Sequence, residues 1–321
     1  MSNLNIVYVY SKMPNLTSEL KLCLPTVQFH NVESDAELKK AEVIVADYDL
    51  MIPNMYNLQN LKWMQGTWAG LDLLTPHINK PLPFILTRFS NHRFGQIMAE
   101  YIITHITIIE RDLLKVFANQ QQKLWSRDGN IFHYRSFSDL SIGIMGLGSI
   151  GEWIARCFSM LGAKIIGYGR KPSPNQQMDF ISPNSYYTKS NINNFLSNCD
   201  YIINTLPSTP ETAGLLNGDV LKSCADRKTV LINVARGSII NENDLICALE
   251  NGWLSHAVLD VFETEPLPKD SRLWATKQVS ITPHVSAISR TKHVAEHFKD
   301  NWNLYVNNLP LLAVYSFDKG Y

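Results

Sequence analysis

The chain of 321 residues has few cysteines, no excess charge of either sign and no long hydrophobic run. Its five cysteines are odd in number, widely spaced and without a C-x-x-C pair, so we expect reduced thiols rather than a disulfide framework. Lys and Arg number 29, as do Asp and Glu, which argues against a general affinity for nucleic acid or an anionic membrane. The first ten residues have no basic stretch followed by an apolar one. We therefore expect no signal peptide, no transmembrane span and a cytoplasmic protein.

Internal repeats of about 20–50 residues and low-complexity segments are also lacking, which argues against a solenoid and a disordered protein. The composition is that of an ordinary globular protein, with 45% hydrophobic and 18% charged residues. A chain of this length suggests about two domains, each able to bury a packed core.

Short apolar runs alternate with helical segments, the pattern of parallel sheets covered on both faces. The first series of predicted strands comprises residues 6–10, 27–30, 43–46, 61–65 and 84–86. The second series comprises residues 141–145, 164–168, 201–205, 230–234, 257–260 and 279–282. We predict a two-domain α/β protein. Residues 94–285 form a Rossmann-type doubly wound parallel sheet, which is inserted in a smaller flavodoxin-like domain of residues 1–93 and 286–321.

A helical pattern with a broad apolar band covers residues 95–123. We predict one long helix there, buried on more than one side, followed by a polar and aromatic arm at residues 125–137. Residues 288–307 are predicted to form a last helix, which belongs to the smaller domain.

The residues after the strand predicted at 141–145 read Gly146-Leu147-Gly148-Ser149-Ile150-Gly151. In this G-x-G-x-x-G pattern the first glycine allows a tight turn, the second lets a pyrophosphate approach the backbone, and the third lets helix pack on strand. The pattern alone is a weak signal, but here a strand precedes it and a helix follows. We therefore predict a dinucleotide site formed by Gly146, Gly148, Ser149, Ile150 and Gly151 at a helix N-terminus.

The end of the next predicted strand indicates which dinucleotide binds. An NAD enzyme usually has Asp or Glu there to bind the ribose hydroxyls, whereas this chain has Gly169-Arg170-Lys171. The guanidinium of Arg170 can bind the 2′-phosphate of NADP with its planar fork, and Gly169 would leave room for that phosphate. We predict NADP(H) as the preferred cofactor, with NAD(H) possible. Two solvated surface cations are the alternative interpretation.

Three residues of complementary chemistry follow successive apolar segments. Arg236 follows a predicted strand end, where a guanidinium can bind a substrate carboxylate and polarise the neighbouring keto oxygen. His284 can donate a proton to that oxygen as a hydride arrives, a transfer that contributes about 10²–10⁴-fold. Glu265 can bind the far nitrogen of His284 and so stabilise one tautomer and the protonated ring. Each residue alone is often structural, but together they predict an enzyme that reduces a ketone next to a carboxylate.

The chain resembles the D-isomer-specific 2-hydroxyacid dehydrogenase family, most closely over residues 140–290. Besides the glycine turn, the motifs that carry the resemblance are Leu206-Pro207-Ser208-Thr209-Pro210-Glu211-Thr212, Asn233-Val234-Ala235-Arg236-Gly237, Leu259-Asp260-Val261-Phe262, Glu265-Pro266-Leu267-Pro268 and Pro283-His284. The resemblance implies that Arg236, Glu265 and His284 are the catalytic residues. It also implies that the cofactor contacts Leu206, Pro207, Thr212, Val234, Ala235, Arg236, Asp260 and His284. Asp260 would bind the nicotinamide carboxamide.

The resemblance is looser in the first 90 residues, where Trp68-Ala69-Gly70 lies at the position of the family's glycine-rich carboxylate-binding loop. The resemblance implies that the backbone amides of Ala69 and Gly70 hold the substrate carboxylate, and that Arg236 and His284 also contact the substrate. Trp68 is larger than the residue expected there. It either narrows the pocket or packs beneath the loop.

Within the family, the chain is most similar to the glyoxylate/hydroxypyruvate reductase A group, on residues 281–290, Leu273-Trp274 and Gly320-Tyr321. This similarity implies NADPH-dependent reduction of small 2-keto acids, such as glyoxylate and hydroxypyruvate, to D-2-hydroxy acids. Two alternatives stay open. One is a reductase for broader or bulkier keto acids, such as pyruvate or phenylpyruvate, and the other is a nucleotide-sensing binding protein like the related transcriptional corepressors.

The family usually forms dimers through its cofactor domains, so the resemblance implies a homodimer built on residues 95–137. In it, Trp125 either reaches the neighbouring active site or is purely structural. One rival motif, His293-Val294-Ala295-Glu296-His297, matches the inverted zinc-protease pattern H-x-x-E-H. Because no third ligand is identifiable, we interpret both of its histidines as lying on a helix surface and predict no metal site.

Overall fold

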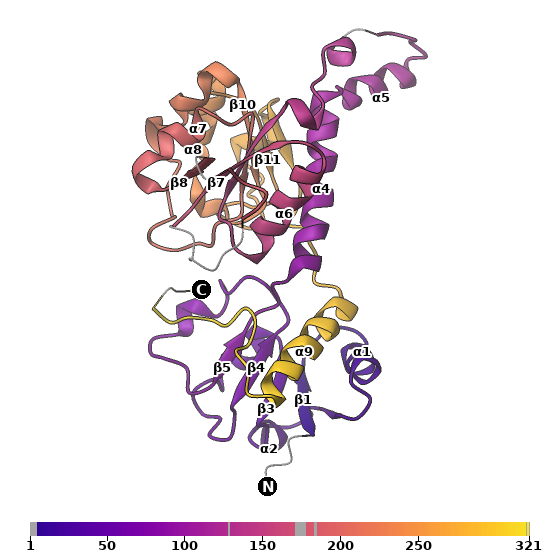
Figure 1. The fold of residues 1–321 in the computed structure, drawn as a ribbon, viewed down its shortest axis with the longest axis vertical. Coiled ribbons are helices and arrows are strands. Elements are labelled where there is room, and N and C mark those ends of the chain that lie inside the picture. The colour runs from indigo at the N-terminus through magenta and orange to yellow at the C-terminus, as the bar shows by residue number, and fades with distance from the viewer. Residues whose placement is uncertain (1–4, 128, 171–177, 183–184, 319, 321) are drawn as a thin grey trace. The chain divides into compact units, whose positions relative to one another are not determined.

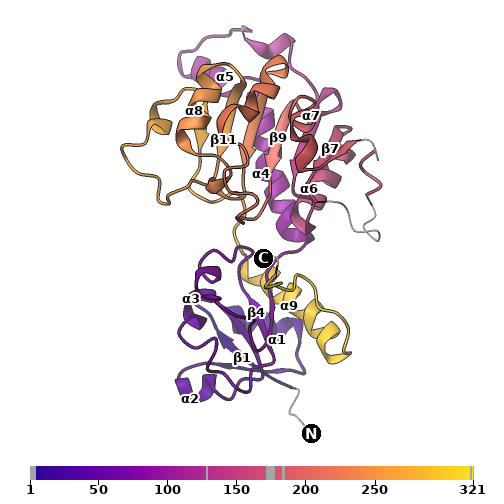
Figure 2. The same cartoon turned by 90° about the vertical axis from the view of Figure 1, so that its left-hand side faces the viewer.

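The computed structural model describes residues 5–127, 129–170, 178–182, 185–318 and 320. The chain divides into two compact units, unit 1 with Met1–Phe94 and Ile288–Tyr321, and unit 2 with Gly95–Ala287. Each unit contains one parallel sheet with helices packed against it (Figures 1 and 2). The predicted α/β class is therefore confirmed for both.

The sheet of unit 1 has the strand order β2-β1-β3-β4-β5, which is the order of flavodoxin-like doubly wound sheets. Its strands are β1 (Ile6–Tyr10), β2 (Gln28–Asn31), β3 (Val43–Ala46), β4 (Trp63–Gly66) and β5 (Ile85–Thr87). Its helical elements are α1 (Leu16–Cys23), α2 (Asp35–Leu38), α3 (Tyr48–Met51), η1 (Thr75–His77) and α9 (Thr291–Val306).

Apolar layers cover both faces of this sheet. On one face α9 lies beside α1 (Figure 1), and Phe298 stacks on Trp63 of β4 with ring centroids 5.1 Å apart. On the other face Ile44 and Met64 pack in one cluster with Tyr48 of α3. Because the strands are buried from both sides, β3 consists of four consecutive apolar buried residues rather than an alternating pattern.

The sheet of unit 2 has the order β12-β11-β10-β9-β6-β7-β8, which is the Rossmann order extended by one strand. Its strands are β6 (Ser141–Met145), β7 (Lys164–Tyr168), β8 (Tyr186–Tyr187), β9 (Tyr201–Asn204), β10 (Thr229–Asn233), β11 (Leu254–Leu259) and β12 (Val279–Ile281). Its α-helices are α4 (His92–Glu110, which begins in unit 1), α5 (Leu113–Gln121), α6 (Ser149–Met160), α7 (Ile192–Leu196) and α8 (Glu242–Glu250). Its 3₁₀ turns are η2 (Asn130–Phe132), η3 (Phe137–Asp139), η5 (Lys189–Asn191), η6 (Gly218–Arg227), η7 (Gly237–Ile239) and η8 (Arg272–Ala275).

The strand order places the glycine turn at the centre of unit 2. The order reverses between β6 and β9, and ligands of open α/β sheets bind at the carboxyl ends of the strands beside such a reversal. All predicted strands are present with bounds within three residues, whereas the two-residue β8 was not predicted because it is too short to show periodicity.

The prediction of one continuous helix over residues 95–123 was wrong. The structure has α4 and α5 instead, separated by Asp112 in a left-handed conformation with φ of 51°. The carboxylate of Asp112 accepts a hydrogen bond from the backbone N–H of Asn130 in the arm, at 3.2 Å. This contact lies far along the sequence, so the apolar spacing of the helix could not reveal it.

In the described parts of the chain, no helix is both long and apolar enough to cross a bilayer.

Candidate active site

The glycine motif forms a tight turn between β6 and α6. Gly146 has φ of 97°, in the left-handed region that favours glycine. A Cβ on Gly151 would lie 2.0 Å from the carbonyl oxygen of Gly146, so a larger residue would push α6 away from β6. At Gly148 a Cβ would meet no described atom within 4 Å, which leaves space at the helix N-terminus. Ser149 and Ile150 begin α6, so the turn has the shape and the backbone amides that a pyrophosphate needs.

The end of β7 carries the cation predicted to select the cofactor. Arg170 is exposed, and its carbonyl oxygen accepts a hydrogen bond of 2.5 Å from the Tyr186 hydroxyl. The Thr209 hydroxyl holds the pKa of Glu211 below its ordinary value, and the positive charge of Arg170 lowers it further. Arg170 therefore lies within electrostatic reach of the loop after β9, and Lys171 falls outside the described residues.

Gly169 lies beside the side chain of Tyr186, and the predicted room for a 2′-phosphate at this glycine stays a prediction. A Cβ on Gly169 would lie 2.9 Å from the hydroxyl oxygen of Tyr186. The space beside this glycine is therefore occupied by the tyrosine of β8, a strand that the sequence analysis did not foresee.

Two buried asparagines at neighbouring strand ends shape the loops beside the glycine turn. Asn204 ends β9 and Asn233 ends β10, and the side-chain amide of Asn204 donates to Oδ1 of Asn233 at 2.9 Å. Their side-chain oxygens also accept hydrogen bonds from the backbone N–H groups of Leu206 and Ala235, which fixes the first residues of both loops, Val234 included. Neither asparagine was predicted as a site residue, although a polar residue that ends an apolar strand is a usable signal.

The loop after β9 is closed by its own threonines. The Thr212 hydroxyl donates to the carbonyl oxygen of Pro207 at 2.6 Å and accepts from the N–H of Thr209 at 2.9 Å. The Thr205 hydroxyl contacts the carbonyl oxygen of Gly146 at 2.6 Å. The loop predicted to line the cofactor is thus joined directly to the glycine turn.

Arg236 follows β10 and precedes a glycine that the fold requires. A Cβ on Gly237 would lie 1.9 Å from the backbone carbonyl carbon of Phe262. Only glycine therefore lets the Arg236 loop approach the segment that leads to Glu265. Arg236 itself is half-buried and has an extended backbone.

Glu265 and His284 form a charge-assisted hydrogen bond although 19 residues separate them. Nδ1 of His284 lies 2.7 Å from Oε2 of Glu265. Because a carboxylate only accepts, Nδ1 carries the hydrogen, and Nε2 is the ring nitrogen left to exchange a proton with a substrate. The other oxygen of Glu265 accepts from the N–H of Phe262 at 3.0 Å, which fixes the carboxylate. The imidazole side chain is 50% exposed within the chain, so a ligand can reach it.

Asp260 is fully buried after β11 and holds the loop of His284. Its Oδ1 accepts from the Thr282 hydroxyl at 2.5 Å and from the N–H of Val285 at 2.8 Å, and its Oδ2 accepts from the N–H of Ser286 at 2.8 Å. Its carbonyl oxygen accepts from the N–H of His284 at 2.9 Å. These bonds position the histidine, whereas the predicted contact of Asp260 with a nicotinamide stays a prediction.

The loop predicted to bind the substrate carboxylate follows β4 in unit 1. The Trp68 ring meets the Tyr48 ring edge-on at 5.8 Å between centroids and packs against the core of unit 1, which favours packing beneath the loop. The Trp68 carbonyl oxygen accepts from the Tyr48 hydroxyl at 2.8 Å. Ala69 and Gly70 are half-buried, and the Arg88 guanidinium donates to the Ala69 carbonyl oxygen at 3.4 Å. Arg88 was not predicted as a site residue, although it directly follows the end of β5.

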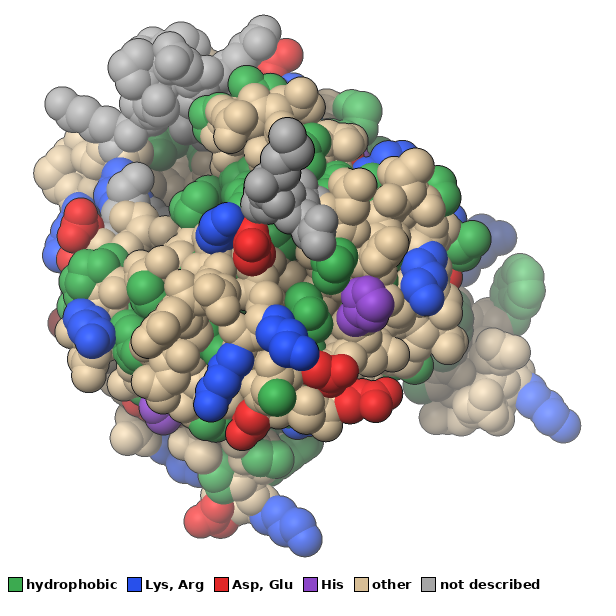
Figure 3. All heavy atoms as spheres, turned by 90° about the horizontal axis from the view of Figure 1, so that it is seen from below, with side chains coloured by type: hydrophobic (Ala, Val, Ile, Leu, Met, Phe, Trp, Pro, Cys, Tyr) green, Lys and Arg blue, Asp and Glu red, His purple; other side chains and the backbone are tan. Residues whose placement is uncertain are grey.

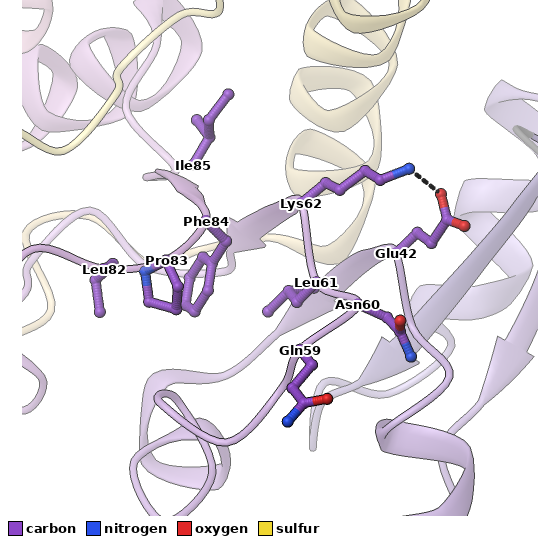
Figure 4. A pocket seen from close by; sticks show the side chains of 9 residues that line it. All are labelled: Glu42, Gln59, Asn60, Leu61, Lys62, Leu82, Pro83, Phe84 and Ile85. Atoms are coloured by element: carbon purple, nitrogen blue, oxygen red, sulfur yellow. Dashed lines mark hydrogen bonds and ion pairs between the residues drawn. The ribbon is translucent and has the colours of Figure 1, made fainter. Parts of the chain in front are cut away.

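Two surface cavities differ in their relation to these residues. One, of about 710 Å³, lies at the amino ends of β4 and β5 in unit 1, with the Glu42–Lys62 ion pair beside it (Figure 4). Because ligands of such sheets bind at the carboxyl ends, we do not assign it to the catalytic site. The other, of about 110 Å³, is lined by Asn233, Gly237 and Phe262, next to the Arg236 loop. On the face seen in Figure 3, the visible side chains of both charge signs are interspersed.

The histidines of the H-x-x-E-H motif are not arranged as a metal site. His297 is only 1% exposed and donates from Nε2 to the carbonyl oxygen of Arg88 at 3.0 Å, so its interpretation as a surface histidine was wrong. It lies on the side of α9 that packs on the sheet, beside Phe89. Glu296 pairs with Arg93 at 2.9 Å. The described residues contain no group of three His, Cys, Asp or Glu side chains that could hold a metal ion.

Comparisons with known proteins agree on one family. A family model described as "D-isomer specific 2-hydroxyacid dehydrogenase, NAD binding domain" matches residues 103–286. A glyoxylate/hydroxypyruvate reductase A from Klebsiella pneumoniae (strain 342) is 32% identical over 295 residues, which cover 89% of this chain and 91% of that protein. A protein of the same name from Escherichia fergusonii is 32% identical over 82% of this chain and 83% of its own.

Solved structures extend the similarity to the whole fold. A D-isomer specific 2-hydroxyacid dehydrogenase from Xanthobacter autotrophicus Py2, in complex with NADPH and MES, has a TM-score of 0.82 and 26% identity and covers 99% of each chain. An NADPH-dependent glyoxylate/hydroxypyruvate reductase from Sinorhizobium meliloti, in complex with NADP and sulfate, has a TM-score of 0.80 and 26% identity and covers 99% of this chain and 100% of its own.

Proposed function

Because the chain belongs to the D-isomer-specific 2-hydroxyacid dehydrogenase family, and is thus an NAD(P)-dependent oxidoreductase, we propose that it reduces small 2-keto acids with NADPH. Glyoxylate and hydroxypyruvate are the proposed substrates, and 2-hydroxy acids, of D configuration where chiral, are the products. The observation that carries the proposal is the 2.7 Å pair of Glu265 and His284, in the same unit as the glycine turn and Arg236. The names of the relatives support the choice of substrate.

The proposed reaction adds a hydride and a proton to the keto group. The turn of Gly146 to Gly151 would hold the pyrophosphate of the cofactor, and the bound reduced cofactor would supply the hydride to the keto carbon. The Arg236 guanidinium binds the substrate carboxylate and stabilises the charge that develops on the keto oxygen. His284 donates the proton of Nε2 to that oxygen, and Glu265 stabilises the charged ring before the transfer.

The substrate carboxylate is also proposed to bind the backbone amides of Ala69 and Gly70 in unit 1. The packing of Trp68 on Tyr48 and the contact of Arg88 with the Ala69 carbonyl oxygen hold this loop in one conformation. A loop that is ordered before binding loses less conformational entropy when the substrate arrives.

NADPH is proposed as the preferred cofactor because Arg170 takes the position where an NAD enzyme usually has an acid. The relatives solved with NADPH or NADP support this choice. We expect Arg170→Ala to raise the KM for NADPH about tenfold or more while changing the KM for NADH less than about twofold. Lys189→Ala, which removes another cation that lowers the pKa of Glu211, is the control. Equal effects on both cofactors would contradict the phosphate contact.

A homodimer is proposed because α5 and the arm expose apolar side chains. Relative exposures are 93% for Trp125, 67% for Phe132, 64% for Leu114 and 53% for Phe117. Large apolar side chains exposed within one short segment of the chain are typical of protein interfaces. Sedimentation equilibrium tests the proposal, and a monomer at micromolar concentration would contradict it.

The five cysteines are free thiols, which supports a reducing compartment such as the cytoplasm.

Initial rates of coenzyme oxidation test the proposed reaction. We expect fast turnover of glyoxylate and hydroxypyruvate with NADPH, slower turnover of pyruvate and phenylpyruvate, and a loss of about 10²-fold or more in kcat for His284→Ala with NADPH binding retained. Preference for phenylpyruvate would favour a bulkier substrate. Coenzyme binding without turnover of any of the four acids would favour a nucleotide-sensing protein.

A further inference from the structure

A chain of hydrogen bonds connects α4 with the loop that carries His284. The hydroxyl of Tyr101 lies 2.6 Å from Oγ1 of Thr282, and this Oγ1 lies 2.5 Å from Oδ1 of Asp260. All of these residues belong to unit 2, in which α4 runs alongside the sheet (Figures 1 and 2). None of the three side chains is fully exposed, and Asp260 is completely buried.

The chemistry of the groups fixes which atom donates and which accepts in each of these hydrogen bonds. A carboxylate can only accept, so the single hydroxyl hydrogen of Thr282 points to Asp260. The Oγ1 of Thr282 must then accept, and the hydroxyl of Tyr101 is the donor. Burial raises the pKa of Tyr101 to about 12, so the tyrosine keeps its hydrogen at neutral pH. The ring of Tyr101 is held by that of His105, with 4.4 Å between their centroids.

Asp260 connects these hydrogen bonds to the backbone of the loop that carries His284. Its carboxylate accepts the N–H groups of Val285 and Ser286, at 2.8 Å each, and its carbonyl oxygen accepts that of His284. His284 has φ of 55°, a conformation that a residue other than glycine keeps only when its surroundings hold it. The bonds to Asp260 hold its backbone, and the bond to Glu265 holds its ring.

We propose that Tyr101 is a positioning residue for the reaction, which acts through Thr282 and Asp260 on the backbone that presents His284. The inference rests on the proposed role of His284. The hydroxyl of Tyr101 contacts Thr282, and not the His284–Glu265 pair that is proposed to handle the proton. Its hydroxyl orients that of Thr282, which keeps the buried carboxylate aligned with the amides of the loop.

The test uses the full-length Tyr101→Phe, Thr282→Val and double variants with NADPH and glyoxylate. We expect kcat to fall about tenfold in Tyr101→Phe and further in Thr282→Val, with the KM for NADPH changed less than about twofold. Because both hydroxyls act in one chain, the double variant should be no slower than Thr282→Val, whereas independent effects would multiply. Multiplied effects, or a kcat of Tyr101→Phe within twofold of the unchanged protein, would overturn the proposal.

Tyr201→Phe is the control for a general loss of stability. It also removes a buried hydroxyl of unit 2, which donates to Glu110 at the end of α4, at 2.7 Å, rather than to the Thr282–Asp260 pair. We expect it to lower the thermal midpoint while leaving kcat within about twofold. A fall in kcat as large as that of Tyr101→Phe would show that stability alone explains the effect.

Hydrogen exchange of the amides of Val285 and Ser286 separates this proposal from the assignment of the reaction. We expect both amides to exchange about tenfold faster in Tyr101→Phe and unchanged in Tyr201→Phe. If the unchanged protein reduces no keto acid, the proposed function fails, and the exchange rates still decide whether Tyr101 holds the loop. Unaltered exchange in Tyr101→Phe would overturn the role of Tyr101, whatever the substrate.

Discussion

At the scale of single residues, the contact between Glu265 and His284 could be expected from their chemistry. The residues that shape the surrounding loops could not. A carboxylate and an imidazole after successive apolar segments are complementary groups, and the structure has them 2.7 Å apart. Asn204 and Asn233 were missed because their role depends on each other, across 29 residues of sequence. Gly237 was recognised only as part of a motif, since its need for a close approach to Phe262 exists only in three dimensions.

The proposed role of Glu265 predicts the effect of removing its charge alone. In Glu265→Gln the side chain can still accept from the N–H of Phe262, but it no longer stabilises a charged His284 ring. We expect the kcat of keto-acid reduction to fall about 10–100-fold, with the KM for NADPH changed less than about twofold. Glu263→Gln, the same change on an exposed neighbour, is the control. Steady-state rates that are equal for the two variants would contradict the role of Glu265.

At the scale of elements, apolar spacing predicted strands well and helix ends poorly. Inner strands such as β3, β6 and β9 are continuous buried runs, so their pattern follows directly from burial on both faces. The break between α4 and α5 is set by partners in the arm instead. Arg135 of the arm binds the buried carboxylates of Glu110, at the end of α4, and of Asp200, at distances of 2.6 and 3.0 Å.

This anchor predicts a pH-dependent loss of stability when Arg135 is removed. Burial raises the pKa of Glu110, but hydrogen bonds from Arg135 and Tyr201 outweigh it and hold the pKa below 4.5. A carboxyl group whose pKa is lower in the folded chain stabilises the fold at pH values above its unfolded pKa. This stabilisation is lost as the pH falls through its folded pKa. We expect Arg135→Met to reduce the free energy of unfolding at pH 7 by about 1–2 kcal/mol, since Arg135 is 40% exposed and partly screened.

Urea unfolding at several pH values measures this effect. The difference between Arg135→Met and the unchanged protein should shrink below about pH 4.5, where Glu110 becomes protonated in the unfolded chain. Arg111→Met is the matched control, because Arg111 is an exposed arginine of the same region that lies 3.9 Å from the centre of the Tyr134 ring. An equal loss in both variants would show that the carboxylates do not need Arg135.

At the scale of the whole molecule, one buried and two half-buried histidines predict how stability depends on pH. Burial lowers the pKa of His105, His256 and His297 below 6.5, and the neighbouring charge of His105 lowers that of His256 further. As the pH falls, these histidines therefore take up protons in the unfolded chain before they do so in the folded chain. They do not reduce the free energy of unfolding above their unfolded pKa, and they reduce it progressively below about pH 6.5.

His297→Gln should flatten this dependence, because an amide keeps a donor for the carbonyl oxygen of Arg88 and cannot be protonated in this range. We expect its thermal midpoint to fall less between about pH 6.5 and pH 5 than that of the unchanged protein. His77→Gln, on an exposed residue, should leave the slope unchanged. Parallel curves for His297→Gln and the unchanged protein would contradict the contribution of His297.

The insertion of unit 2 into unit 1 has a consequence for the order of events during synthesis. Residues 5–94 leave the ribosome first, but α9, whose Phe298 covers Trp63, follows only after all of unit 2. Unit 2 is contiguous and can complete its sheet while unit 1 still has an uncovered apolar face. The part of the enzyme that is translated first is therefore the last to be finished. During this interval the ring of Trp63 lacks the stacking partner that Phe298 later provides.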